Sequence, residues 1–143
     1  GWHQQRWDVP LIIVLLAMGC KSNPDKHIEF IEGYWEIESV YKNNQLLRTF
    51  KINSGIDYFK INADLKGFRK KLKPNFNGSF ETSKDVLNFK IEIQNNGLFL
   101  NYIDNATSYR EEVLEANKEK LVIKSNSGLV YNYKPYEALD LSQ

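Results

Sequence analysis

From residue 33 onward, apolar and polar side chains alternate with a period close to two. This period is typical of β-strands that have one buried and one solvated face. The clearest case is the segment 87–93, in which leucine, phenylalanine and two isoleucines alternate with asparagine, lysine and glutamate. Turn-forming sequences such as Asn95-Asn96-Gly97 and Asn126-Ser127-Gly128 interrupt the pattern about every ten residues. The pattern therefore predicts an all-β domain.

The expected strands follow one another along most of the chain. They are residues 35–41, 46–52, 56–61, 66–73, 76–82, 87–93, 98–103, 108–116, 120–124 and 129–134. The segment 109–117 also permits a helix, but its place in a series of hairpins favours a strand, and 28–31 suits either one helical turn or an entry strand. The segment 76–82 is the weakest of the expected strands, and eight to nine short strands joined by hairpins predict an antiparallel up-and-down β-barrel, with a sandwich as the alternative. Closing the meander into a barrel removes its exposed edges.

A run of eight apolar residues, Leu11 to Met18, precedes Gly19 and the only cysteine, Cys20. A membrane-spanning helix needs about 20 apolar residues, so this run instead suits the apolar core of a signal peptide. The end of the run resembles the lipobox of bacterial lipoproteins. That resemblance implies cleavage between Gly19 and Cys20 and attachment of lipid, including palmitate-type acyl chains, to the Cys20 thiol. We therefore expect a lipid-anchored protein of the bacterial cell envelope, on the periplasmic face of the outer membrane or on the cell surface.

These features divide the chain into four expected segments. Residues 1–19 form the signal peptide, 20–30 a lipidated tether, 31–136 the barrel and 137–143 a tail. The residues before Leu11 include two tryptophans and an aspartate and begin with glycine, so we expect a truncated or mis-started reading frame there. Lipid on the one cysteine would leave the mature chain without a thiol for disulfides, thiolate metal sites or nucleophilic catalysis.

Gly33-Tyr34-Trp35 opens the first long strand. This sequence resembles the Gly-x-Trp motif that begins the lipocalin barrel, and the segments 108–115, 120–124 and 128–133 look like the closing strands of small lipocalin-like lipoproteins. The resemblance covers about residues 31–136. It implies that Gly33 lets the chain enter the barrel sharply and that Trp35 closes the barrel floor. It also implies an eight-stranded barrel whose interior holds a small ligand or is filled by side chains.

The charge balance of the chain bears on which classes of partner it could bind. Nineteen basic and 18 acidic residues give a net charge of +1, which offers no bulk attraction for nucleic acid. Only the stretch Lys66 to Lys73 is strongly basic. It suits either a solvated strand or a contact with anionic lipid head groups. We expect a monomer.

Catalytic residues are scarce. The two histidines, His3 and His27, lie in the predicted signal peptide and tether, so we expect no Ser-His nucleophile and no metal site built on imidazole. Glu111 and Glu115 would share one face of a strand, which leaves acid–base catalysis or Ca²⁺ binding open; solvated, paired charges are the alternative. We therefore expect a protein that is not an enzyme and needs no cofactor.

Aromatic residues recur on the expected strands, and tyrosines suit a ligand cavity because they combine an apolar ring with a hydroxyl. The candidate ligand-binding residues are Tyr41, Tyr58, Phe89, Tyr102, Tyr109 and Tyr131. The predicted function is that of a membrane-anchored, lipocalin-like protein that binds a small hydrophobic or amphipathic molecule. The alternative is a protein–protein interaction module of the cell envelope, or an inhibitor of a secreted enzyme.

Overall fold

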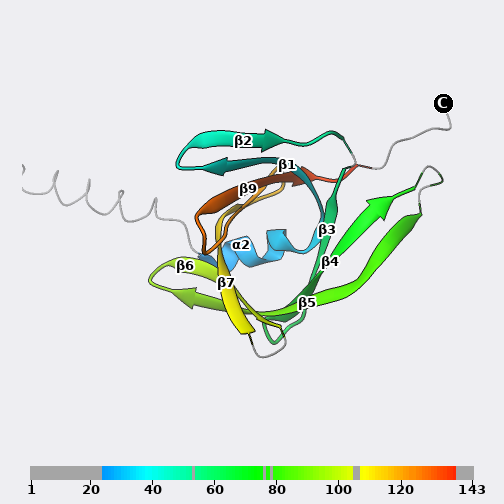
Figure 1. Cartoon of the computed structure of the whole chain (residues 1–143). Helices are drawn as coiled ribbons and strands as arrows, with labels where there is room; N and C mark the ends of the chain where they lie inside the picture. The colour runs from blue at the N-terminus through cyan, green and yellow to red at the C-terminus, as the bar shows by residue number, and fades with distance from the viewer. Residues whose placement is uncertain (1–23, 53, 76, 78, 105–106, 138–143) are drawn as a thin grey trace, which may run out of the picture.

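A computed structural model describes residues 24–52, 54–75, 77, 79–104 and 107–137 (Figure 1). Its elements are the helix α2 (Pro24–Ile31) and the strands β1 (Gly33–Lys42), β2 (Gln45–Thr49), β3 (Ile56–Ile61), β4 (Lys66–Pro74), β5 (Phe80–Gln94), β6 (Gly97–Asp104), β7 (Thr107–Ala116), β8 (Leu121–Lys124) and β9 (Leu129–Pro135). The predicted signal peptide, with Gly19 and Cys20, lies outside the described residues.

The strands form one antiparallel sheet that closes on itself. Each strand from β3 to β9 pairs with its neighbour in the chain, and β9 returns to pair with β1 from Lys42↔Leu129 to Trp35↔Pro135. Strands β1 and β3 to β9 therefore make a closed eight-stranded barrel, while β2 is attached to β1 alone. The predicted all-β, up-and-down barrel is confirmed, because each hairpin turn joins strands that are adjacent in the sheet.

Two strands, β2 and β5, differ from their predicted bounds by more than two residues. Segments 76–82 and 87–93 were expected to be separate strands, but β5 runs without a break from Phe80 to Gln94. Its register against β4 shifts between Lys70 and Leu72, so an irregularity in the pairing lies between the two expected segments. The strand expected over 46–52 ends at Thr49. The segment 108–116 is a strand, as predicted, and β7 begins one residue earlier, at Thr107.

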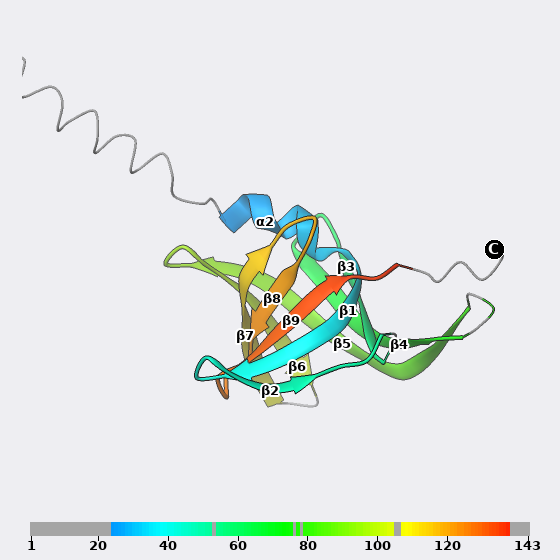
Figure 2. The ribbon, with the colours of Figure 1, turned by 90° about the horizontal axis from the view of Figure 1, so that it is seen from above.

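The segment expected to be a tether forms α2 over most of its length. Ile28, Phe30 and Ile31 pack against the barrel core, and Ile31 is completely buried. A free tether would expose these apolar side chains, so burial favours the helix. Figure 2 shows α2 across one end of the barrel and β2 at the other. No helix in the described part of the chain is long and apolar enough to cross a membrane.

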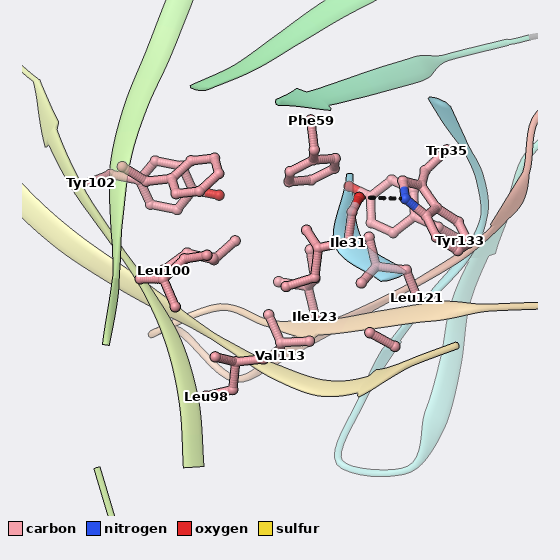
Figure 3. Packing of buried hydrophobic residues seen from close by; sticks show 13 residues of the cluster. Ile31, Trp35, Phe59, Leu98, Leu100, Tyr102, Val113, Leu121, Ile123 and Tyr133 are labelled. Atoms are coloured by element: carbon pink, nitrogen blue, oxygen red, sulfur yellow. Dashed lines mark hydrogen bonds between the residues drawn. The ribbon is translucent and has the colours of Figure 1, made fainter. Parts of the chain in front are cut away.

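Trp35 fastens α2 to the barrel. Its indole Nε1 donates a hydrogen bond to the backbone oxygen of Ile31 at 2.8 Å, and Figure 3 shows the side chains of Phe59, Leu121 and Ile123 gathered around this contact. Gly33, two residues earlier, has a φ of +133°, a conformation that side chains rarely adopt. The Gly-x-Trp motif thus marks a sharp entry into the barrel followed by a buried closing residue.

Strand β1 changes its partner halfway along one edge. Residues 33–36 pair with β3, whereas residues 39–42 pair with β2. The chain leaves β1 where the Phe50 amide bonds to the Glu38 oxygen, and it returns where the Ile37 amide bonds to the Gly55 oxygen. At the end of the barrel away from α2, β1 therefore pairs with β2 instead of β3. The sheet is interrupted there between β1 and β4. This discontinuity sets the position of the cavity described below.

Gly67 should be intolerant of any side chain, because a Cβ there would overlap the backbone oxygen of Lys60 and lie 2.9 Å from the Phe89 ring. We expect Gly67→Ala to lower the free energy of unfolding by about 1–3 kcal/mol, measured by chemical denaturation. Gly55→Ala is the matched control, since its nearest neighbour would be Ile37 Cγ2 at an ordinary 3.4 Å, and should change stability by less than about 1 kcal/mol. Equal losses in the two variants would contradict the packing argument.

Candidate functional site

A layer of polar side chains lies across the interior of the barrel. Strand alternation directs one set of side chains inward, and this set includes Asp57 on β3, Arg69 on β4, Tyr102 on β6, Glu111 on β7 and Tyr133 on β9. Asp57 and Arg69 are 6% and 8% exposed, so both charged groups are buried. Five strands therefore supply one buried polar cluster, which we call the Arg69 network.

The guanidinium of Arg69 donates every hydrogen bond that it can make. Its Nε and Nη2 donate to Asp57 Oδ2 at 3.0 and 2.5 Å, and Nη2 also donates to the Tyr133 hydroxyl at 2.5 Å. Its Nη1 donates to the Tyr102 hydroxyl at 3.1 Å and to Glu111 Oε1 at 2.9 Å. These five bonds match the five N–H groups of an arginine side chain.

The two tyrosine hydroxyls stay protonated. Burial raises the pKa of the Tyr102 and Tyr133 phenols well above the ordinary value, although the nearby Arg69 charge opposes this. Burial alone would lower the pKa of Arg69, because it disfavours the charged form. The neighbouring oxygens of Tyr133 and Asp57 outweigh this effect and raise the pKa well above its ordinary value, so the guanidinium keeps its charge. The Tyr133 hydroxyl can therefore donate, and it bonds to Asp57 Oδ2 at 3.0 Å.

Apolar side chains fill the barrel between the Arg69 network and α2. The Arg69 guanidinium lies 5.0 Å from the centre of the Phe59 ring, and the Tyr102 ring packs edge-on against Phe89 at 5.7 Å. Beyond these rings lie the other buried residues of the core, which are Ile31, Trp35, Ile91, Leu98, Leu100, Val113, Ala116, Leu121 and Ile123. This half of the barrel is a packed core rather than a ligand chamber.

A cavity of about 500 Å³ lies on the other side of the network. It occupies the place where β1 leaves β3, and Asp57 and Tyr133 of the network belong to its lining. The remaining lining residues are Ile37, Phe50, Ser54, Gly55, Ile56, Lys71, Leu72, Lys73, Glu81, Thr82 and Tyr131. The cavity therefore has mainly apolar walls, a polar floor and charged residues at its mouth.

Four of the six aromatic residues proposed for ligand binding lie at or beside this site. Tyr131 lines the cavity and Tyr102 belongs to the Arg69 network. Tyr109 stacks on Tyr102 with ring centres 4.9 Å apart, and Phe89 supports Tyr102 from the core.

The other two candidates lie elsewhere. Tyr58 packs against Tyr34 with tilted rings whose centres are 4.6 Å apart, on the opposite face of β3 from Asp57. Tyr41 is half-buried near the end of β1 and is not among the cavity-lining residues. The alternation of each strand puts aromatic residues on both faces, so strand position alone could not separate inner from outer rings.

Glu111 and Glu115 do not form a pair of inward acids, and each instead forms an ion pair with a basic residue, which was the other interpretation of this segment. The register of β7 against β8 shifts between Val113 and Glu115, so Ala116 rather than Glu115 continues the buried face. Glu115 instead pairs with Lys120 at 3.0 Å on the surface, while Glu111 binds Arg69. Within the described residues, no group of three or more histidine, cysteine or acidic residues could hold a metal ion.

The sequence reasoning missed Asp57, Arg69 and Tyr133 as site residues. Arg69 was treated as part of an exposed basic stretch, but it lies inside the barrel, whereas Lys71 and Lys73 lie exposed at the cavity mouth. A usable signal was present, because Asp57 and Arg69 are on the same face of one hairpin as Phe59. An acid and a base at alternating positions with a core aromatic indicate a buried pair.

The comparison with known families agrees with this architecture. A family model described as a lipocalin-like domain matches residues 31–123. No curated protein and no solved structure matches the chain.

Replacing Arg69 should leave two buried carboxyl groups without their cation. We expect Arg69→Met to lower the free energy of unfolding by about 3–5 kcal/mol in denaturant titrations. Arg110→Met is the matched control, because Arg110 lies exposed over Phe99 and donates a hydrogen bond to the exposed side chain of Gln94. The control should cost less than about 1 kcal/mol. A small loss in Arg69→Met would show that the network is not the interior constraint that its geometry indicates.

Proposed function

The chain belongs to the family of lipocalin-like domains, and from that premise we propose that it binds one small hydrophobic or amphipathic molecule in the cavity of its barrel. The observation that carries the proposal is the cavity itself. Its volume of about 500 Å³ falls within the range of about 300–1,000 Å³ that is usual for small-molecule sites. Ligand sites also typically combine apolar walls with a few polar groups that orient the ligand.

The lining suits a molecule with an apolar body. Ile37, Phe50, Ile56, Leu72 and Tyr131 provide hydrophobic surface on several sides. Burying apolar ligand surface there would contribute roughly 25 cal/mol for each Å² removed from water. The polar groups of the floor and mouth would fix the orientation of the ligand rather than supply most of its affinity.

A second candidate is interaction with another protein through the outside of the barrel. Tyr34 is 44% exposed, and its ring lies 4.6 Å from Tyr58 and 5.6 Å from Phe80, which in turn contacts Tyr136 at 5.7 Å. Clustered exposed aromatic rings are typical of interaction surfaces. This function does not need the cavity, so closing the cavity mouth would leave it unchanged.

Closing the cavity mouth should abolish ligand binding without unfolding the barrel. Thr82 is exposed and lines the cavity, so we expect Thr82→Trp to remove a copurifying ligand that native mass spectrometry detects on the unaltered protein. Thr107→Trp is the matched control, because Thr107 is also exposed on a strand but does not line this cavity. Adducts that survive in Thr82→Trp, or spectra of the unaltered protein without any adduct, would argue against the proposal.

We further propose that lipid on Cys20 anchors the protein to a membrane of the bacterial cell envelope. Support comes from the resemblance of the segment ending in Gly19-Cys20 to a lipobox. The fold is compatible with this anchor, because the chain enters the barrel through α2, at the end opposite the cavity. A barrel attached from that end would keep its cavity mouth accessible, and two or more acyl chains would be enough for stable attachment.

Metabolic labelling with a fatty-acid precursor tests this anchor. We expect the full-length protein, expressed in a bacterial host with a functional start codon, to incorporate the label and to fractionate with membranes. Cys20→Ser should lose both properties because it lacks the thiol that accepts lipid, whereas Ser22→Ala should keep them. Labelling that persists in Cys20→Ser would refute attachment at this residue.

A further inference from the structure

Resting on the proposed ligand-binding function, we infer that the cavity selects molecules whose polar head group donates hydrogen bonds, such as a hydroxyl or an ammonium, over those that end in a carboxylate. The inference depends on which groups of the polar floor still have unused hydrogen-bonding capacity. Asp57 and Tyr133 are the two members of the Arg69 network that line the cavity. The bonds within the network determine what they offer to a ligand.

Arg69 has no unused N–H group with which to bind an anionic ligand. A buried arginine beneath a ligand cavity would ordinarily suggest a carboxylate or phosphate ligand, because its planar N–H groups match those anions. Here all five N–H groups are used by Asp57, Glu111, Tyr102 and Tyr133. A ligand carboxylate could bind Arg69 only by displacing a carboxyl group or a tyrosine hydroxyl of the protein that already bonds to it.

Asp57 has unused capacity as an acceptor. Its Oδ2 receives the Nε and Nη2 groups of Arg69 and the hydroxyl of Tyr133. No described residue donates a hydrogen bond to Oδ1, although the Asp57 side chain is only 8% exposed. An ionised carboxyl group can accept about two hydrogen bonds at each oxygen. A donor on the ligand would satisfy this buried oxygen.

The charges of the network favour the same class of ligand. Two acidic side chains, Asp57 and Glu111, share the single guanidinium of Arg69. A carboxylate placed against this floor would add a third acidic group where little water can screen it, and such like-charge contacts are unfavourable. An ammonium would instead complement the acidic excess, and a neutral hydroxyl would donate a hydrogen bond without adding charge.

The mouth of the cavity provides the one competing arrangement. Lys71 and Lys73 are exposed there beside Glu81, so a carboxylate could lie at the mouth with its apolar chain pointing inward. That orientation would leave Asp57 Oδ1 without a donor and would hold the ligand by solvated charges, which contribute little. The floor therefore gives the stronger selection, and a Lys71 variant can detect the alternative.

Three probes with one apolar chain and different head groups test the inference: octylammonium, octanol and octanoate. We expect isothermal titration calorimetry at neutral pH to show that the first two bind at least about tenfold more tightly than octanoate. Thr82→Trp should abolish the heats of all probes that enter the cavity. Asp57→Asn should reduce the preference of octylammonium over octanoate, whereas the matched control Asp64→Asn, at an exposed turn outside the cavity, should preserve it.

The outcomes separate the inference from the function on which it rests. If octanoate binds as tightly as octylammonium and octanol, the inferred selectivity is wrong while the ligand-binding function stands. A loss of octanoate binding in Lys71→Gln would then assign the carboxylate to the mouth. If no probe binds, and the protein also carries no copurifying ligand, the proposed function itself fails. The series on the unaltered protein decides between these outcomes even if Asp57→Asn does not fold.

Discussion

The buried charge of Arg69 is the constraint on which the interior of this barrel depends. An isolated guanidinium inside a protein is strongly unfavourable unless its hydrogen bonds are satisfied. Here the necessary acceptors come from β3, β6, β7 and β9, and they surround an arginine supplied by β4. Because the partners are spread over the sheet, the strands must hold one register for all five bonds to form. The complete network can therefore form only in the closed barrel with this register.

The same network divides the barrel into two halves. Towards α2, the rings of Phe59 and Phe89 meet apolar side chains from every side, and Trp35 fastens the helix over them. Away from α2, β1 exchanges its partner β3 for β2, and the wall opens. The cavity lies in this second half, with the network as its floor. A filled half supplies the core that a barrel of this size needs, and so the other half can stay hollow.

The sequence alone predicted the barrel well because alternation and hairpin turns are local features. It failed where pairing between strands changes that alternation. The register shift after Val113 separates Glu111 from Glu115, and the shift near Lys70 lies where β5 joins two segments that were expected to be separate strands. The site was harder still, since Arg69 stands among four lysines within eight residues, and only the pairing of β3 with β4 places it beside Asp57. The helix α2 was missed as a full element because its apolar residues gain stability only against the closed barrel.

The segment that shows family membership contains most, but not all, of the polar network. The lipocalin-like model covers residues 31–123, which include Asp57, Arg69, Tyr102 and Glu111 but not Tyr133. Tyr133 lies on β9, which closes the barrel against β1, and its hydroxyl both accepts from Arg69 and donates to Asp57. A fold of this kind can host many ligands, because the site rather than the barrel decides what is bound. In this chain the decisive property is that the N–H groups of Arg69 already bond to other groups of the protein. The cavity floor contains an arginine, but what it offers a ligand is a hydrogen-bond acceptor.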